Sequence, residues 1–199
     1  MIASEGFLDW FRREEEWSRA GLLMAVALLL AGPFVYQGVG FADFLVYLQL
    51  PVYMLHQYEE HAHGAFQAFM NGLLAPYARV LSDRQIFWIN IGGVWLLDTV
   101  VLYLAYGVGA AIGLIAPYLA IVNAVIHIGA ALRQRRYNPG LWTSVLLFLP
   151  VGGYAVVVIS RAALASPLAE GLALGAGILL HVIVIIAIAR GRRTNGQEP

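Results

Sequence analysis

The chain has 199 residues, of which 60% are hydrophobic and 12% are charged, and its mean hydropathy is +0.73. A soluble domain is nearer half apolar and a quarter charged, so this composition excludes that class and indicates an integral membrane protein with a single domain. The absence of cysteine excludes disulfides and thiolate metal ligands. The formal net charge is zero and every basic residue is an arginine, so no nucleic-acid-binding surface is expected.

Residues 1–19 mix aromatic side chains with charges, as in Trp10-Phe11-Arg12-Arg13. This mixture is typical of an amphipathic helix that lies in the membrane interface ahead of a first span. The acidic run Glu14-Glu15-Glu16 argues against the alternative, a cleaved signal peptide. We therefore expect an interfacial segment over residues 1–19.

Residues 20–190 are expected to form one membrane domain, because their apolar stretches have the ~20 residues that a helix needs to cross a bilayer. The sequence predicts an all-α, polytopic transmembrane helix bundle of about six spans: 20–36, a helix from about 42 past 64 toward 76, 86–107, 110–132, 141–160 and 169–189. Pro51 is expected to bend the second of these, since it removes a backbone donor. Residues 191–199 are expected to be a short disordered cytoplasmic tail.

The arginines predict the orientation of the bundle. If the six helices alternate from a cytoplasmic N-terminus, every arginine except Arg161 falls on the cytoplasmic side. The positive-inside rule favours that arrangement. We therefore expect a multi-pass protein of the inner (plasma) membrane, with both termini in the cytoplasm.

One stretch, residues 56–63, is rich in ionisable side chains and reads His-Gln-Tyr-Glu-Glu-His-Ala-His. A helical residue advances by about 100°, which places His56, Glu59, Glu60 and His63 on one face and His61 on the other. Polar residues continue along the same face and make a stripe that needs an interior or a wet cavity. These further residues are Gln49, Tyr53, Gln67 and Asn71.

Two more histidines are expected at a similar depth. His127 and His181 each lie a few turns before an arginine-bearing helix end, in the predicted cytoplasmic half of the membrane. Asn123 is one turn before His127 and is expected to orient it. Asp98, in the middle of a span, is expected to face the bundle interior.

These residues resemble a known family. His56-x-x-Glu59-Glu60, a further histidine and the segment Tyr137-x-Pro139-Gly140 are similar to the motifs of the HXXEE family of small bacterial membrane proteins, a family of unknown function. The resemblance implies that the motif residues are important, and His127, ten residues before the Tyr-x-Pro-Gly segment, is preferred to His181 as the further histidine. Turn chemistry alone also accounts for Pro139-Gly140, as a tight connection between two spans.

The leading functional hypothesis is a membrane-embedded metalloenzyme, an oxidoreductase or a hydrolase, that acts on a lipid-like substrate at the cytoplasmic side. Imidazole and carboxylate groups suit iron, zinc or manganese, and the Glu60-x-x-His63 spacing is that of di-iron helices. The catalytic candidates are Glu59, Glu60 and Tyr137. The candidate ligands are His56, Glu59, Glu60, His63, His127 and His181.

Other interpretations of the same residues stay open. A metal-free enzyme would use a glutamate and a histidine as acid and base, and a proton or metal-ion transporter would use the polar stripe and Asp98 as a path. A non-catalytic subunit is a third class. Structural roles are also open, with the cluster projecting into water, His127 bonded to Asn123 and His181 packed among apolar neighbours. Glycines such as Gly171 and Gly175 allow close helix contacts, including those of a homo-oligomer.

Overall fold

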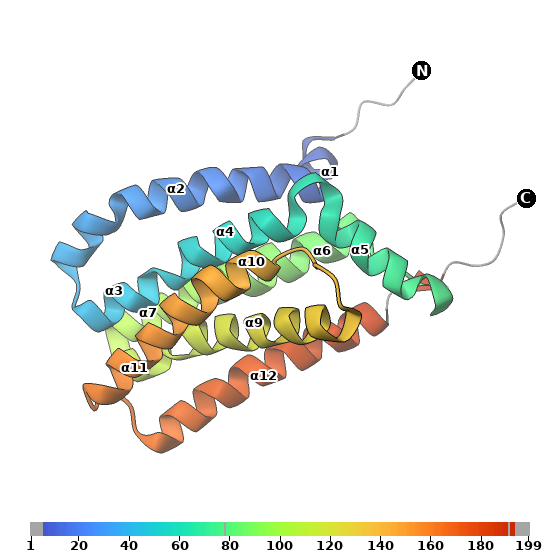
Figure 1. The fold of residues 1–199 in the computed structure, drawn as a ribbon. Helices are drawn as coiled ribbons and strands as arrows, with labels where there is room; N and C mark the ends of the chain where they lie inside the picture. The colour runs from blue at the N-terminus through green and yellow to red at the C-terminus, as the bar shows by residue number, and fades with distance from the viewer. Residues whose placement is uncertain (1–5, 78, 191, 194–199) are drawn as a thin grey trace, which may run out of the picture.

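The structure is a computed structural model that describes residues 6–77, 79–190 and 192–193, and in this part of the chain it is a bundle of helices (Figure 1). Two strands of two residues each, β1 (Arg79–Val80) and β2 (Arg192–Arg193), pair with each other in the antiparallel direction. The helices in chain order are α1 (Phe7–Phe11), α2 (Glu14–Gly38), α3 (Phe41–Tyr47), α4 (Gln49–His61), η1 (Ala62–Gly64), α5 (Ala65–Leu74), η2 (Ala75–Tyr77), α6 (Asp83–Phe87), η3 (Trp88–Trp95), α7 (Leu96–Val108), α8 (Ala110–Gly113), α9 (Ile115–Gln134), α10 (Leu141–Thr143), η4 (Ser144–Gly152), α11 (Gly153–Arg161) and α12 (Pro167–Ala189).

Five helical stretches of the described chain are long and apolar enough to cross a bilayer. They are Glu14–Gly38, Asp83–Val108, Ala110–Gln134, Leu141–Arg161 and Pro167–Ala189. Each contains or closely matches a span predicted from the sequence, so the all-helical, multi-span fold is confirmed. Contact with a lipid bilayer follows from it.

The remaining predicted span, from residue 42, is divided in two. α3 ends at Tyr47 and α4 begins at Gln49. Pro51 lies in the first turn of α4, where a missing N–H costs little. Because proline has no N–H to donate to the carbonyl of Tyr47, the helix is interrupted at the place where a bend was predicted. Together α3 and α4 still run along the bundle beside α2 (Figure 1), although they are not among the five candidate membrane spans of the described chain.

The prediction that the second helix continues through Gly64 toward Pro76 is wrong. α4 ends at His61, because Ala62 is extended (ψ 136°) and both His63 (φ 59°) and Gly64 (φ 68°) have left-handed backbone. The chain turns there and continues as α5. Two left-handed residues in succession end any α-helix, and Gly64 is the one of the pair that adopts this conformation without steric cost.

The N-terminal region, predicted as an interfacial segment over residues 1–19, is divided between two helices in the described chain. Residues 1–5 lie outside the described residues, α1 is a short exposed helix, and the long helix α2 already begins at Glu14. Glu14 and Trp17 in its first two turns are buried, at 3% and 0% exposure. The start of α2 therefore packs into the bundle instead of lying on its surface. At the other end of the chain, 191 and 194–199 of the expected tail lie outside the described residues.

The core of the bundle contains the acidic residue that the sequence places in the middle of a span. Asp98 on α7 is buried as expected, at 2% exposure, and its carboxylate has no hydrogen-bond partner among the described residues. An apolar cluster packs between α4, α9 and η4 and consists of Val52, Tyr53, Leu119, Ala120, Ala124 and Phe148. α1, α5 and the C-terminal end of α12 lie together at one end of the bundle (Figure 1).

Candidate metal centre

Three side chains from two helices converge in the interior next to that apolar cluster. His56 and Glu60 lie one turn apart on α4, and His127 comes from α9. One ligand atom from each lies within 4.8 Å of the other two. Nε2 of His56 is 3.6 Å from Oε2 of Glu60, and Nε2 of His127 is 3.5 Å from Oε1 of the same carboxylate. His56 is fully buried and Glu60 nearly so.

The hydrogen bonds of the two histidines fix which ring nitrogen carries the proton. His127 Nδ1 lies 2.7 Å from Asn138 Oδ1, an atom that only accepts. His56 Nδ1 lies 2.9 Å from Thr143 Oγ1, which gives its own hydrogen to Glu59 Oε2. Both Nδ1 atoms are therefore donors, and in the neutral imidazoles both Nε2 atoms keep a lone pair that faces Glu60.

Donors are lacking at the centre of this group. The Nε2 atoms lie beyond the 2.7–3.2 Å of an N–H···O hydrogen bond to Glu60, and Nε2 of His56 is buried without a partner among the described residues. Two lone pairs and a carboxylate that point at one another form a group that could hold a metal ion. Atoms bound about 2.0–2.1 Å from a tetrahedral zinc lie about 3.3–3.4 Å apart, which is close to the 3.5 and 3.6 Å found here.

Glu59 does not face this group and instead fixes the loop that follows α9. Its carboxylate accepts hydrogen bonds from four groups: the Tyr137 hydroxyl (2.9 Å), the backbone N–H groups of Trp142 (3.0 Å) and Thr143 (2.7 Å), and the Thr143 hydroxyl (2.5 Å). Partial burial and the bond to Glu59 raise the pKa of Tyr137 to about 12. The phenol therefore stays protonated at neutral pH and keeps donating.

Gly140 explains why this loop ends in Pro-Gly. Its backbone is left-handed (φ 90°), and a Cβ added there would lie 2.7 Å from Cε1 of His56 and 2.9 Å from Cε1 of His127. The two imidazoles thus pack directly on the backbone of Gly140, which leaves no space for a side chain. Asn138, in the same loop, holds His127 through its Oδ1 and also donates to the His127 carbonyl at 2.9 Å.

The other predicted site residues lie outside the central group. The side chain of His63 is 78% exposed, with Nδ1 3.5 Å from Glu15 Oε1, because the helix that was expected to carry it inward ends two residues earlier. Nδ1 of His181 on α12 bonds to the Gly177 carbonyl at 2.8 Å, and its ring lines a neighbouring cavity. Glu59 and Tyr137 bond to each other where α4 contacts the loop that follows α9.

Asn123 does not orient His127, and that prediction is wrong. The amide of Asn123 donates to the Tyr53 hydroxyl at 2.8 Å, and Asn138 takes its place beside His127. Helical spacing alone placed Asn123 near His127, whereas the loop after α9 folds back and supplies a better-placed partner.

A second buried pair, Glu14 with His61, was not found from the sequence. His61 points to the opposite side of α4, as expected, and there Nδ1 lies 2.5 Å from Oε1 of Glu14 on α2. Both side chains are nearly fully buried, and Nε2 of His61 lies 3.3 Å from Oε2 of Glu60 without a hydrogen-bond partner among the described residues. An acidic residue at the start of an apolar helix was the available signal, but it does not indicate a partner 47 residues away.

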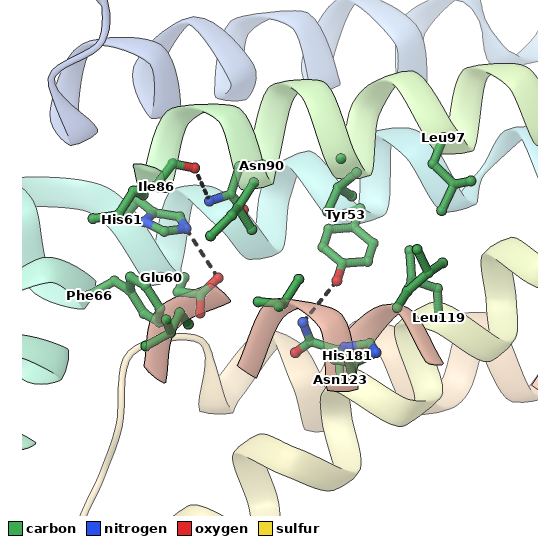
Figure 2. Close-up of a pocket in the computed structure, with 16 residues that line it drawn as sticks. Tyr53, Glu60, His61, Phe66, Ile86, Asn90, Leu97, Leu119, Asn123 and His181 are labelled. Carbon is green, nitrogen blue, oxygen red and sulfur yellow. Dashed lines mark hydrogen bonds and ion pairs between the residues drawn. The ribbon is translucent and has the colours of Figure 1, made fainter. Parts of the chain in front are cut away.

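A cavity of about 120 Å³ lies beside Glu60, between α4, η3, α9 and α12. Figure 2 shows His61 and Glu60 at one end, Leu97 and Leu119 at the other, and Tyr53 and Asn123 between them. Apolar side chains make up most of the wall. The candidate metal group thus borders a cavity that has one polar and one apolar end.

A comparison with known protein families gives a match. A family model described as "Protein of unknown function with HXXEE motif" matches residues 47–155, which is more than half of the chain. No curated protein and no solved structure matches. The matched region contains the three residues of the central group, the Glu59 contact and Gly140, so the chain belongs to the HXXEE family and its motifs build one buried His/Glu centre.

Proposed function

We propose that the protein is a membrane-embedded enzyme that holds one divalent metal ion through His56, Glu60 and His127. The observation that supports this most directly is the set of buried acceptors that converge without a donor. Two imidazoles and one carboxylate also make up the ligand set of catalytic zinc sites and of non-haem iron sites, both of which keep positions open for substrate or water. Iron, zinc and manganese are the candidate metals.

The surroundings of these ligands favour a working site. Each histidine has a hydrogen-bond partner on Nδ1, namely Thr143 or Asn138, which orients the ring and sets its tautomer as the outer shell of a metal site does. A metal held there would act as a Lewis acid or activate a bound water. Glu59 and Tyr137 are then positioning residues, because they fix the loop that carries Asn138, Gly140 and Thr143.

An enzyme is favoured over a transporter because the site is closed toward the opposite end of the bundle. Phe148 packs against His56, with 4.3 Å between the ring centroids, and the buried apolar cluster of Tyr53, Leu119 and Ala124 lies beyond it. A path for ions would need a continuous row of polar groups there, whereas the buried Asp98 carboxylate has no hydrogen-bond partner among the described residues. The mostly apolar cavity beside Glu60 suits a lipid-like substrate.

We place the site at the cytoplasmic side of the membrane. The ends of α2, α6, α9 and α12 that carry arginines lie at the same end of the bundle as the C-terminal end of α4. Arg161, the last residue of α11, lies at the other end. The positive-inside rule assigns the arginine-rich end to the cytoplasm. A substrate would thus reach the site from the bilayer near its cytoplasmic surface.

The metal content of the purified protein tests the proposal. Tag-free protein in detergent is expected to carry about one iron, zinc or manganese ion per chain, and the His56→Ala, Glu60→Ala double variant none, because two of the three ligands are removed. His63→Ala is the matched control, since this exposed histidine lies outside the group and its loss should leave the content unchanged. Elemental analysis gives the result. A folded wild type that stays metal-free after growth and reloading with these metals would contradict the proposal and favour metal-free acid and base chemistry.

Turnover is tested separately by comparing the lipids of expressing cells. Cells that express wild type or His63→Ala are expected to accumulate a modified lipid that is absent with Glu60→Gln, because the amide weakens a ligand without changing its size. Mass spectrometry of total lipid extracts measures this. Identical lipid profiles in all three strains, at equal protein levels, would count against an enzyme.

A further inference from the structure

We infer that the cavity beside Glu60 opens sideways into the bilayer between η3 and α12, and that one straight alkyl chain of a membrane lipid enters it there. This inference rests on the proposed function for its link to catalysis and goes beyond it by naming the entrance and the part of the lipid that passes through it. It is based on the packing of α12, the exposure of Gly93 and the volume of the cavity.

The cavity lies between two spans whose backbones stay apart along its length. η3 and the start of α7 form one wall, which includes Gly93, and α12 forms the opposite wall, which includes Val184. α12 packs against α9 and α8, and no comparably close approach joins it to η3 or α7 in the described chain. Figure 2 shows the two walls as the green ribbon that carries Asn90 and the red ribbon beside His181.

Apolar contacts close the gap at both ends. Leu180 on α12 and Leu97 on α7 pack on the same buried cluster around Tyr53. Two turns further along α12, Ile188 packs on the cluster that contains Ile86. Val184 lies halfway between Leu180 and Ile188 on one face of the helix. The opening is therefore about 12 Å long, the rise of eight helical residues.

Gly93 places the mouth of the cavity at the outer surface of the bundle. This residue lines the cavity and is also exposed, so the cavity reaches the surface beside it. A Cβ added to Gly93 would meet only the backbone oxygen of Trp88, at 3.9 Å, so no side chain covers the position. Leu96 on the one wall and Ile185 on the other are apolar and exposed, as lipid-facing residues are.

The opening lies at the depth of the lipid tails. Val184 is six residues before Arg190, or about 9 Å along α12. The arginine-rich end of the bundle marks the membrane surface, and the hydrocarbon core is about 30 Å thick, so Val184 falls inside this core. An empty apolar cavity loses the dispersion contacts that a chain would supply, and it does not attract water. Alkyl chains are therefore the expected occupants.

The volume limits what can enter. An apolar cavity of roughly 150 Å³ takes up a benzene molecule, so the 120 Å³ here suits about six carbon atoms or fewer, and the fused rings of a sterol do not fit. None of the described residues that line the cavity is an arginine, so a phosphate headgroup finds no partner in it and stays outside. The part of the lipid that reaches Glu60 is thus a segment of one chain.

Photolabelling of the full-length protein in lipid vesicles tests this inference. The probe is a phosphatidylcholine with a diazirine in one acyl chain, and the vesicles consist of the same lipid without the diazirine. Leu119 is the diagnostic residue, because it lines the cavity and is only 3% exposed. The acyl probe is expected to label Leu119, and a sterol with a diazirine is expected to label outward residues such as Leu96 alone. Peptide mass spectrometry locates the label.

Filling the mouth provides matched variants. Gly93→Leu places a side chain in the opening and is expected to abolish labelling of Leu119, and Val184→Phe, from the other wall, is expected to do the same. Gly107→Leu is the control, since this exposed glycine lies on the same span and a Cβ there meets nothing within 4 Å. Labelling of Leu119 that survives both filling variants, or equal labelling by the sterol, would overturn the inference.

The double variant His56→Ala, Glu60→Ala separates this inference from the proposed function. Its mouth is intact, so the acyl probe should still label Leu119 although two proposed ligands are gone. Labelling of Leu119 in a wild type that never holds metal would contradict the metalloenzyme and leave the entrance standing. Metal-loaded wild type without label at Leu119 would overturn the entrance alone.

Discussion

Replacing Gly140 with alanine is expected to lower the affinity for the proposed metal ion by about 100-fold, the upper end of the range for residues that support a metal site. The added Cβ would lie 2.7 Å from a carbon of His56 and 2.9 Å from a carbon of His127, closer than real Cβ contacts. The left-handed backbone at φ 90° adds strain for any residue but glycine. Both rings must move, and they are two of the three proposed ligands. Competition titrations with a chelator measure the change.

Gly129→Ala on α9 is the control for this variant. Gly129 lies in the helix that carries His127, and a Cβ there meets nothing within 4 Å. Alanine should leave metal affinity unchanged and stabilise the helix by up to about 1 kcal/mol. Wild-type metal affinity in folded Gly140→Ala protein would contradict the arrangement of the two histidines around this loop.

Replacing Glu59 with glutamine is expected to lower the free energy of unfolding by about 2–3 kcal/mol and the metal affinity by about tenfold. The carboxylate accepts from two backbone N–H groups and two hydroxyls. A glutamine has only one oxygen, so its amide NH₂ would face donors. The loop that holds Thr143 and Asn138 against the histidines would loosen as a result. Denaturation in detergent and metal titration on the same protein measure both effects.

Tyr137→Phe is the companion variant. It removes only one of the four hydrogen bonds, at an exposed position, and should cost about 0.5–1.5 kcal/mol with metal affinity nearly unchanged. If Glu59→Gln proved as mild as Tyr137→Phe, the carboxylate would not be the residue that holds the loop.

The parts of the site that helical periodicity fixes were predictable from the sequence. His56 and Glu60 lie four residues apart on one helix, so their common face follows from geometry, and the apolar stretches gave the five long spans. His63 shows the limit of this reasoning. It lies seven positions after His56, but the helix ends between them at His61, and only Gly64 hints at that end. A periodicity holds only as far as the helix that carries it.

Contacts between distant segments could not be predicted. Thr143 orients His56 from 87 residues away, and Glu14 meets His61 from 47 residues before it. Neither residue belongs to a spacing that single-sequence patterns recognise, because the packing of whole helices brings them together. Gly140 was carried over from the family motif, but the reason for it, the absence of room for a Cβ, appears only once both rings are placed.

Glu14 and His61 lie far apart in the sequence, so they are not synthesised at the same time. The ribosome makes α2 first, so the carboxylate of Glu14 has no histidine beside it until α4 emerges, and Glu60 has no second imidazole until α9 follows. The loop with Gly140 closes the site later still. A nascent chain that has made only α2 thus carries Glu14 without His61, and one that has made the chain through α7 carries Glu60 without His127, so the quality-control proteases of the membrane would meet the site in incomplete states.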